Sequence, residues 1–322
     1  MTDVSCLEFG DAFEGGLEAV SWPQRLKTIE FHATSAFNKP IDLVQWPASL
    51  QRLAFGGMFI QPIDGAKFPS SLQELAFFAG FNQPIAGVVL PSSLQKLHLG
   101  LNFDHPIEDV AWPQSLRQLT FGEDFTHPIE LAKFPASLKH LTFEAFSNFD
   151  QPIRQVAWPT SLEKLAFGRC FDQPIEGVLW PDSLLSLSFG TCFNQSIDNV
   201  KWPASLQELT IGCCLGVGCG RMIMRSEFNQ RIGRSAWPPS LRRLTLGHKF
   251  RQSLQGLGTW MPNLESLRLL EWYVDSQTDS LLRRIEWPKG LVQLTVFKES
   301  SLEDVGIPAP VEVLHRYNAS LR

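Results

Sequence analysis

The chain has 322 residues, of which 44% are hydrophobic and 19% are charged, and its formal net charge is -5. This composition supplies an ample core, and the small negative charge gives no general attraction to nucleic acid. No stretch approaches the roughly 18 apolar residues of a membrane helix, and the first residues do not resemble a secretion signal. We therefore expect a cytoplasmic protein that keeps its six cysteines reduced.

A motif of about 22 residues recurs along almost the whole chain. The copy at 47–69 has apolar residues at Leu50, Leu53 and Phe55, then a glycine pair, then Phe59 and a Pro-Ile pair. The apolar alternation predicts a short strand, and the prolines of the return segment argue against a helix there. A unit this short cannot bury its apolar face alone, so successive copies must stack.

In chain order, the repeats predict a capping repeat at 1–24 and regular repeats over 25–262, interrupted by an insertion at 213–225. Degenerate repeats and a second cap follow at 263–322. We therefore expect a single repeat solenoid, mainly β: a right-handed, leucine-rich-repeat-like coil. Its concave face would carry one parallel sheet of about thirteen strands, and its convex side would be irregular and turn-rich.

Two apolar columns should form ladders inside this solenoid. Leucine opens nearly every strand motif, and phenylalanine recurs once after each glycine turn. Regularly spaced aromatic rings are also found on platforms that stack bases or sugars. Because these rings fall at inward positions, we interpret them as core. The phenylalanine column comprises Phe13, Phe37, Phe59, Phe81, Phe103, Phe125, Phe149, Phe171, Phe193, Phe228 and Phe250.

The segment Leu94-x-x-Leu97-x-Leu99 resembles the core of leucine-rich repeats. The run Phe81-Asn-Gln-Pro-Ile85, followed by Pro91-Ser-Ser-Leu94, is more similar to the FNIP repeat family, and the similarity extends over most of the chain. This resemblance implies a leucine-rich-repeat-like scaffold for interactions between proteins.

One outward column of the predicted sheet is polar and of mixed charge, and the column beside it is mostly small, with the larger His98 as an exception. A shallow, mixed-charge floor suits a protein partner better than a small molecule. The polar column comprises Arg52, Glu74, Lys96, Gln118, His140, Lys164, Glu208 and Arg243.

The insertion at 213–225 lengthens one repeat, so that Pro203 and Pro238 are 35 residues apart. It could present a partner-binding tip, for which the candidates are Arg221, Met222, Met224 and Arg225. It could equally be a tolerated surface insertion. Its cysteines lack the paired spacing of a zinc site.

Charge is also uneven along the chain. Bases dominate 221–251, with Glu227 as the one acid, and only acids occur before Arg25. This pattern fits an acidic partner or head-to-tail contact between copies of the chain, and it also fits an ordinary solvated surface. His105 and His127 occupy a column that is otherwise mostly glutamine, and we interpret them as replacements for it.

We find no phosphate loop, metal-protease motif or nucleophile elbow, so we expect no enzyme, cofactor or metal site. The sequence favours a non-catalytic scaffold that binds an unidentified protein through the concave face and the 213–225 loop. The alternatives are a structural subunit of a larger assembly, in which copies of the chain associate, and a solenoid that binds glycan or nucleic acid. Binding to membranes is not expected.

Overall fold

A computed structural model of the chain describes residues 4–213, 226–233, 236–269, 285–296, 307–308 and 311–315. The chain divides into two compact units. Unit 1 comprises Met1–Gln151 with Val156–Leu162, and unit 2 comprises Pro152–Gln155 with Glu163–Arg322. The boundaries that the repeat suggests at residues 24 and 262 stay predictions.

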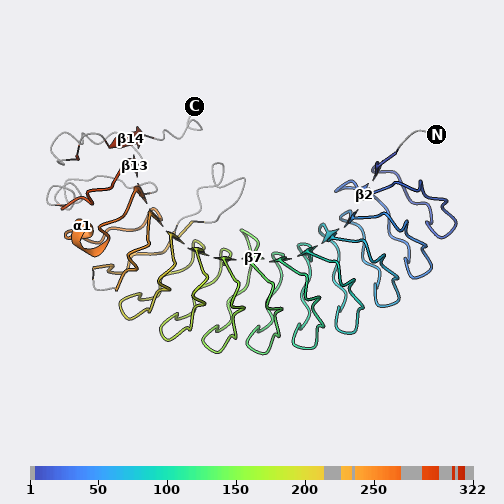
Figure 1. Ribbon diagram of the computed structural model, residues 1–322, viewed down its shortest axis with the longest axis horizontal. Helices are drawn as coiled ribbons and strands as arrows, with labels where there is room; N and C mark the ends of the chain where they lie inside the picture. The colour runs from blue at the N-terminus through green and yellow to red at the C-terminus, as the bar shows by residue number, and fades with distance from the viewer. Residues whose placement is uncertain are drawn as a thin grey trace. The chain divides into compact units, whose positions relative to one another are not determined.

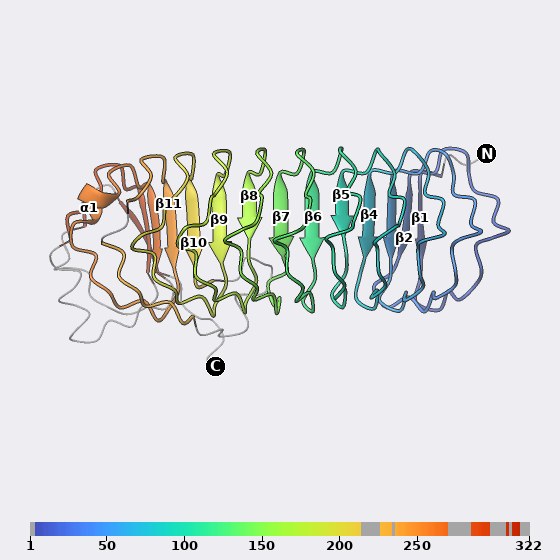
Figure 2. The same cartoon turned by 90° about the horizontal axis from the view of Figure 1, so that it is seen from below.

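Each unit is a stack of coils in which every coil contributes one short strand to a parallel sheet, and the strands lie side by side in chain order (Figures 1 and 2). The predicted parallel solenoid is therefore confirmed. The strands of unit 1 are β1 (Cys6–Phe9), β2 (Thr28–Phe31), β3 (Arg52–Phe55), β4 (Glu74–Phe77), β5 (Lys96–His98), β6 (Gln118–Phe121) and β7 (His140–Phe143). Those of unit 2 are β8 (Lys164–Ala166), β9 (Ser186–Phe189), β10 (Glu208–Ile211), β11 (Arg243–Leu246), β12 (Ser266–Leu269), β13 (Gln293–Val296) and β14 (Glu312–His315).

The core of each unit consists of the predicted columns. Within the strands, inward residues such as Leu53 and Phe55 are buried, while their neighbours Arg52 and Ala54 are half-exposed. The phenylalanine rings of successive coils stack with centroids 5.9 to 6.4 Å apart. The phenylalanine ladder is thus confirmed as core within each unit. Full burial of one such side chain contributes about 1.5–3 kcal/mol.

Serine in the Pro-x-Ser-Leu part of the motif joins each coil to the one before it. The hydroxyl of Ser71 donates to the carbonyl of Leu50 at 2.6 Å, and Ser93 donates in the same way to Leu72. These bonds satisfy carbonyl groups at the start of the strands, where no strand partner reaches them. The same contact occurs at Ser49, Ser115, Ser137, Ser161, Ser205 and Ser240.

The Phe-Asn-Gln part of the motif forms a second ladder. The side-chain oxygen of Asn229 accepts the backbone N–H of Arg251 in the next coil at 2.8 Å. The side-chain amide of Gln252 then donates to the carbonyl of Asn229 at 2.9 Å. His127 takes the place of glutamine, and its Nε2 lies 3.1 Å from the carbonyl of Asp104. The interpretation of the histidines as replacements for glutamine agrees with this geometry.

The degenerate C-terminal repeats keep the strand register. In unit 2, β12 pairs in parallel with β11 and with β13, and β13 pairs with β14. Glu312–His315, which lie within the segment 263–322 where we expected degenerate repeats and a second cap, thus form a further strand of the sheet. Among the described residues, the one helix is α1 (Leu257–Trp260), a single turn that follows Gly256.

Candidate functional site

The predicted partner-binding side chains of the sheet lie on its solvent side, one per coil. In unit 1 they open strands β3 to β7 and are direct register neighbours: Arg52, Glu74, Lys96, Gln118 and His140. In unit 2, Lys164, Glu208 and Arg243 open β8, β10 and β11. Apart from Lys96 and Arg243, which are exposed, these residues are of intermediate exposure. We call this solvent side of the strands the sheet face.

Charges on the sheet face of unit 1 form a chain of ion pairs. Arg52 contacts Glu30 of the preceding strand and Glu74 of the following strand, and Lys96 Nζ lies 3.9 Å from Glu74 Oε2. These side chains are 26–52% exposed, so each pair contributes about 0–1 kcal/mol to stability. The candidate residues thus largely neutralise one another. Glu30, which the sequence analysis missed, lies in the neighbouring row as the register partner of Ala54 and reaches Arg52 from there.

Unit 2 repeats this arrangement around Glu208. Arg243 Nε donates to Glu208 Oε1 at 2.7 Å, and the Ser186 hydroxyl lies 3.4 Å from Glu208 Oε2. Lys164 lies two strands before Glu208 on the same row, separated from it by Ser186. Lys164 forms no ion pair with any described residue. Its ammonium group is therefore more available to a partner than the paired guanidinium of Arg243.

His98 reaches across the sheet face of unit 1 to an acid two coils away. Its Nε2 lies 3.0 Å from Glu144 Oε1, and its Nδ1 lies 3.0 Å from the carbonyl oxygen of Phe77. The hydrogen bond from His98 lowers the pKa of Glu144 below its ordinary value, and partial burial opposes that shift. Glu144 immediately follows β7, in one of the coils that are two residues longer than most.

The lowered pKa of Glu144 predicts a pH dependence of stability. The folded-state pKa is below the unfolded one, so the ionised carboxylate stabilises the fold above its ordinary pKa of 4.5. This contribution is lost as the pH falls through the folded-state value. Glu144→Gln should therefore lower the urea midpoint slightly at neutral pH, and the difference from wild type should vanish in acid. A difference that grows in acid would contradict this assignment.

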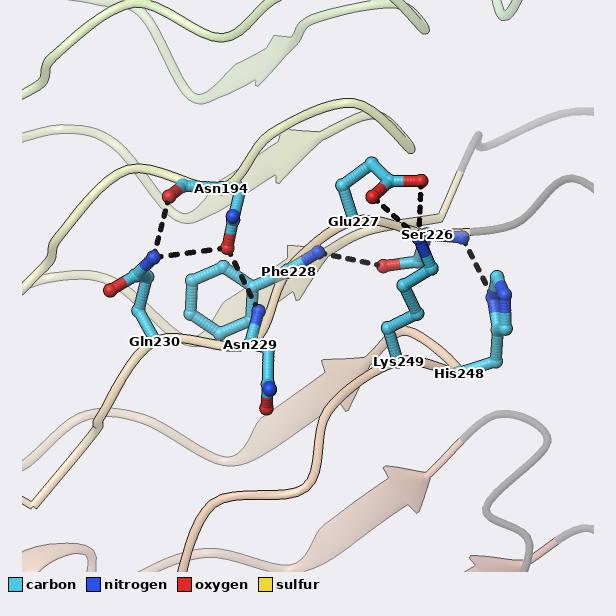
Figure 3. Close-up of polar contacts among 8 residues, drawn as sticks. All are labelled: Asn194, Ser226, Glu227, Phe228, Asn229, Gln230, His248 and Lys249. Atoms are coloured by element: carbon cyan, nitrogen blue, oxygen red, sulfur yellow. Dashed lines mark hydrogen bonds and ion pairs between the residues drawn. The ribbon is translucent and has the colours of Figure 1, made fainter.

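The insertion is the part of the predicted site that the structure describes least. Arg221, Met222, Met224 and Arg225 lie outside the described residues, so their predicted role stays a prediction. Cys213, whose side chain is of intermediate exposure, is the last described residue before them. The coil that resumes at Ser226 makes polar contacts with the coil before it and the coil after it (Figure 3).

Three contacts hold this resumed coil in place, as Figure 3 shows. The Ser226 N–H donates to His248 Nδ1 at 2.7 Å, and the Asn229 N–H donates to Asn194 Oδ1 at 3.0 Å. Gln230 Nε2 donates to the Asn194 carbonyl at 2.9 Å. The ladder of asparagine side-chain contacts therefore continues from Asn194 to Asn229, on the two sides of the insertion. The phenylalanine column continues in the same way, because Phe193 stacks on Phe228. The described residues on either side of the insertion thus keep the coil-to-coil contacts of the regular repeats.

The described bases of the 221–251 region are mostly paired. Lys249 Nζ lies 2.6 Å from Glu227 Oε2, and Arg242 Nε lies 3.3 Å from Glu265 Oε1. Arg251 donates to the carbonyl of His248 at 2.6 Å. This pairing agrees with a solvated surface and weakens the case for a free basic patch.

Unit 2 also has an open cavity of about 790 Å³ between neighbouring return segments. Its charged lining residues Arg154, Glu176 and Lys201 are all exposed to solvent. The remaining lining is largely proline and aliphatic side chains. No buried polar group is directed into the cavity from these residues, so it lacks the convergent polar groups of a small-molecule site.

Within the described part of the chain, no three His, Cys, Asp or Glu side chains gather as they would around a metal ion. No described helix has the length and apolarity to cross a membrane.

Comparison with known proteins identifies related repeats. The FNIP Repeat family matches residues 37–78, 81–124, 103–145, 125–170 and 171–214, which together exceed half of the chain. The crystal structure of CroV588, described as a novel circular LRR protein, is 33% identical, with a TM-score of 0.72. The match covers 91% of this chain and 43% of CroV588. This chain therefore spans less than half the length of that protein.

Two other solved structures show weaker similarity. The pneumococcal vaccine antigen PcpA is 15% identical, with a TM-score of 0.24, over 91% of this chain and 72% of that one. A leucine-rich repeat protein from Bacteroides ovatus is 12% identical, with a TM-score of 0.21, over 91% of this chain and 79% of that one. Scores this low support no structural conclusion. No curated protein matches the sequence.

Proposed function

Since the chain belongs to the FNIP repeat family, whose repeats build a leucine-rich-repeat-like solenoid, we propose that it is a non-catalytic scaffold that binds a partner protein. The partner would contact the sheet face and the 213–225 loop. Solenoids of this kind are typically binding proteins rather than enzymes, because their repeated surface offers area instead of an enclosed, water-excluding site.

The observation that carries this proposal is the arrangement of side chains on the sheet face. A row of partly exposed polar side chains lies beside a floor of small residues, and Ala54, Ala76, Thr120 and Thr142 form that floor in unit 1. Small side chains let a partner approach the strands closely, and the polar row supplies hydrogen bonds and charges. Protein interfaces combine contact area with such dispersed polar groups.

Alanine variants of Arg52, Lys96, Lys164 and Arg243 test the proposal. A partner would first be identified by cross-linking mass spectrometry in native extract, and its affinity would then be measured with purified components. We expect Lys96→Ala and Lys164→Ala to weaken binding about 5- to 30-fold, which corresponds to roughly 1–2 kcal/mol. Arg52→Ala and Arg243→Ala should have smaller effects, because these guanidinium groups already donate hydrogen bonds to Glu74 and Glu208, whereas Lys96 approaches Glu74 only to 3.9 Å.

The paired arginines act as matched controls for the lysines, since Arg52 lies on the same row as Lys96 in unit 1, and Arg243 lies on the same row as Lys164 in unit 2. Unchanged affinity in all four variants would reject the sheet face as the binding surface. A loss that is larger for the paired arginines than for the lysines would show that the partner replaces the internal ion pairs.

A further inference from the structure

The repeats of this chain can be compared with one another, and two adjacent coils of unit 1 depart from the rest. The residue that follows the strand is glycine in most coils, as at Gly10, Gly56 and Gly122, but it is phenylalanine at Phe78. We call the segments that run from the end of each strand through the following Gln-Pro, His-Pro or Lys-Pro pair, together with residues 10–14 after β1, the strand-exit edge. Phe78 is 51% exposed there.

Two further apolar residues replace polar ones on the same edge. Ile60 occupies the ladder position that Asn38 and Asn82 hold in the coils before and after it. Met58 occupies the position of Asn102 two coils later. Ile60 is 48% exposed and Met58 is 59% exposed. We call Met58, Ile60 and Phe78 the exit patch.

The exit patch is continuous across the two coils. The N–H of Gly80 donates to the carbonyl of Gly57 at 2.8 Å, which brings the two turns together. A Cβ atom at Gly57 would lie 3.5 Å from a ring carbon of Phe78, and one at Gly80 would lie 3.2 Å from Ile60 Cγ2. Each large side chain therefore lies beside a glycine of the other coil.

Isoleucine at position 60 interrupts the asparagine ladder. Asn38 Oδ1 accepts the Ile60 N–H at 3.1 Å, and Asn82 Oδ1 accepts the Asp104 N–H at 3.0 Å. Ile60 offers no such acceptor to the Asn82 N–H. A hydrogen bond of this kind contributes about 0.5–1.5 kcal/mol. The chain thus forgoes a repeat contact and exposes apolar surface at the same place, which is typical of a binding site rather than of the scaffold.

Charge around the exit patch indicates what it binds. In unit 1 the strand-exit edge contains one lysine, Lys39, and no arginine. Its carboxylates include Asp11 on one side of the patch, and Glu123 and Asp124 on the other. Backbone hydrogen bonds from turn to turn place these acids two coils from the patch, or about 10 Å. The acidic carboxylates of this edge are Asp11, Glu14, Asp104, Glu123, Asp124, Glu144 and Asp150.

Resting on the scaffold function above, we propose that the exit patch docks a partner segment with an apolar anchor flanked on both sides by lysine or arginine. The anchor would cover Phe78, Ile60 and Met58, and the flanking cations would face Asp11 and the Glu123–Asp124 pair. A spacing of about 10 Å corresponds to about three residues of an extended chain or about seven of a helix.

Selection of random peptides displayed on phage, with the full chain as bait, tests this assignment. Enriched peptides should carry a large apolar residue between basic ones. Synthetic versions should bind about tenfold more weakly to the combined variant Met58→Asn, Ile60→Asn, Phe78→Gly, a loss of about 1.4 kcal/mol. This variant restores residues that the chain itself uses at the same positions, so it should fold, and urea titration would check that. Asp124→Asn should weaken binding and reduce its dependence on salt.

Val89→Lys provides the matched control. Val89 is 79% exposed on a return segment, and Lys67 holds the same position one coil earlier. This variant should leave the affinity unchanged. Enriched peptides that are acidic, or that bind the combined variant as tightly as wild type, would overturn the exit patch as the site.

The outcomes separate this inference from the scaffold proposal. Peptides that lose affinity with Lys96→Ala but not with the combined variant would support the sheet face and reject the exit patch. Absence of any enrichment would count against both. Light scattering of the chain alone is one further test. If the chain forms a dimer and the combined variant is monomeric, then the exit patch binds a second copy of the chain. That result would overturn the proposal that it binds a basic partner segment.

Discussion

Replacing Phe103 with alanine is expected to lower the free energy of unfolding by about 3–5 kcal/mol. Phe103 is 0% exposed, and its ring is 6.4 Å from that of Phe81 and 6.2 Å from that of Phe125. The substitution would leave a cavity that the rings above and below cannot fill, because backbone hydrogen bonds fix the spacing of the coils. Urea titration measures the loss as a shift of the midpoint.

Phe13→Ala is the matched control for Phe103→Ala. Phe13 belongs to the same column but is only partly buried, and within the column it stacks on Phe37 alone, at 5.9 Å. We expect it to cost about 1–2 kcal/mol, in proportion to its smaller buried area. Equal losses at the two positions would contradict a ladder in which each interior ring is covered on both sides.

Gly122→Ala is expected to destabilise unit 1 by more than about 3 kcal/mol, or to prevent folding. A Cβ atom at this position would lie 1.8 Å from the Gly100 carbonyl oxygen and 2.5 Å from Leu101 Cα. Both are backbone atoms of the preceding coil, so no side-chain movement can relieve the clash. Circular dichroism and thermal unfolding would measure the effect.

Gly10 occupies the same column as Gly122 and provides its control. It follows β1, which has no strand of the described chain on its other side, and a Cβ there would meet nothing within 4 Å. Gly10→Ala should be neutral or stabilising by up to about 1 kcal/mol, since alanine restricts the unfolded chain. If Gly10→Ala lowered the stability as much as Gly122→Ala, the recurrence of glycine after the strands would be explained by intrinsic backbone preference rather than by the stacking of coils.

The fold was predictable because each structural role recurs at one position of the repeat. Leu53 and Phe59 each have counterparts in nearly every coil, so a single copy identified the strand, the turn and the inward columns. The recurring serine and asparagine were visible too. Their roles required coordinates, because a hydrogen bond such as that from Ser71 to Leu50 joins neighbouring coils rather than neighbours in sequence.

The candidate site was less predictable because it consists of positions where the repeats differ. The period alone places Arg52 beside Glu74, so their pairing could have been inferred from sequence. The contact of His98 with Glu144 could not, because it skips a coil and Glu144 lies in a turn two residues longer than usual. The exit patch became recognisable only after Asn38 and its equivalents were seen to bond from coil to coil.

Disulfide trapping tests most directly whether successive coils stack in register. Ala54 and Ala76 are register partners on the sheet face of unit 1, so their Cα atoms should lie about 4.8 Å apart, within reach of a disulfide. Oxidation of the Ala54→Cys, Ala76→Cys variant should give the cross-linked peptide pair in mass spectrometry. The Ala54→Cys, Thr120→Cys variant, three strands apart, should give none. Cross-linking of the distant pair without the near pair would contradict the stacked solenoid.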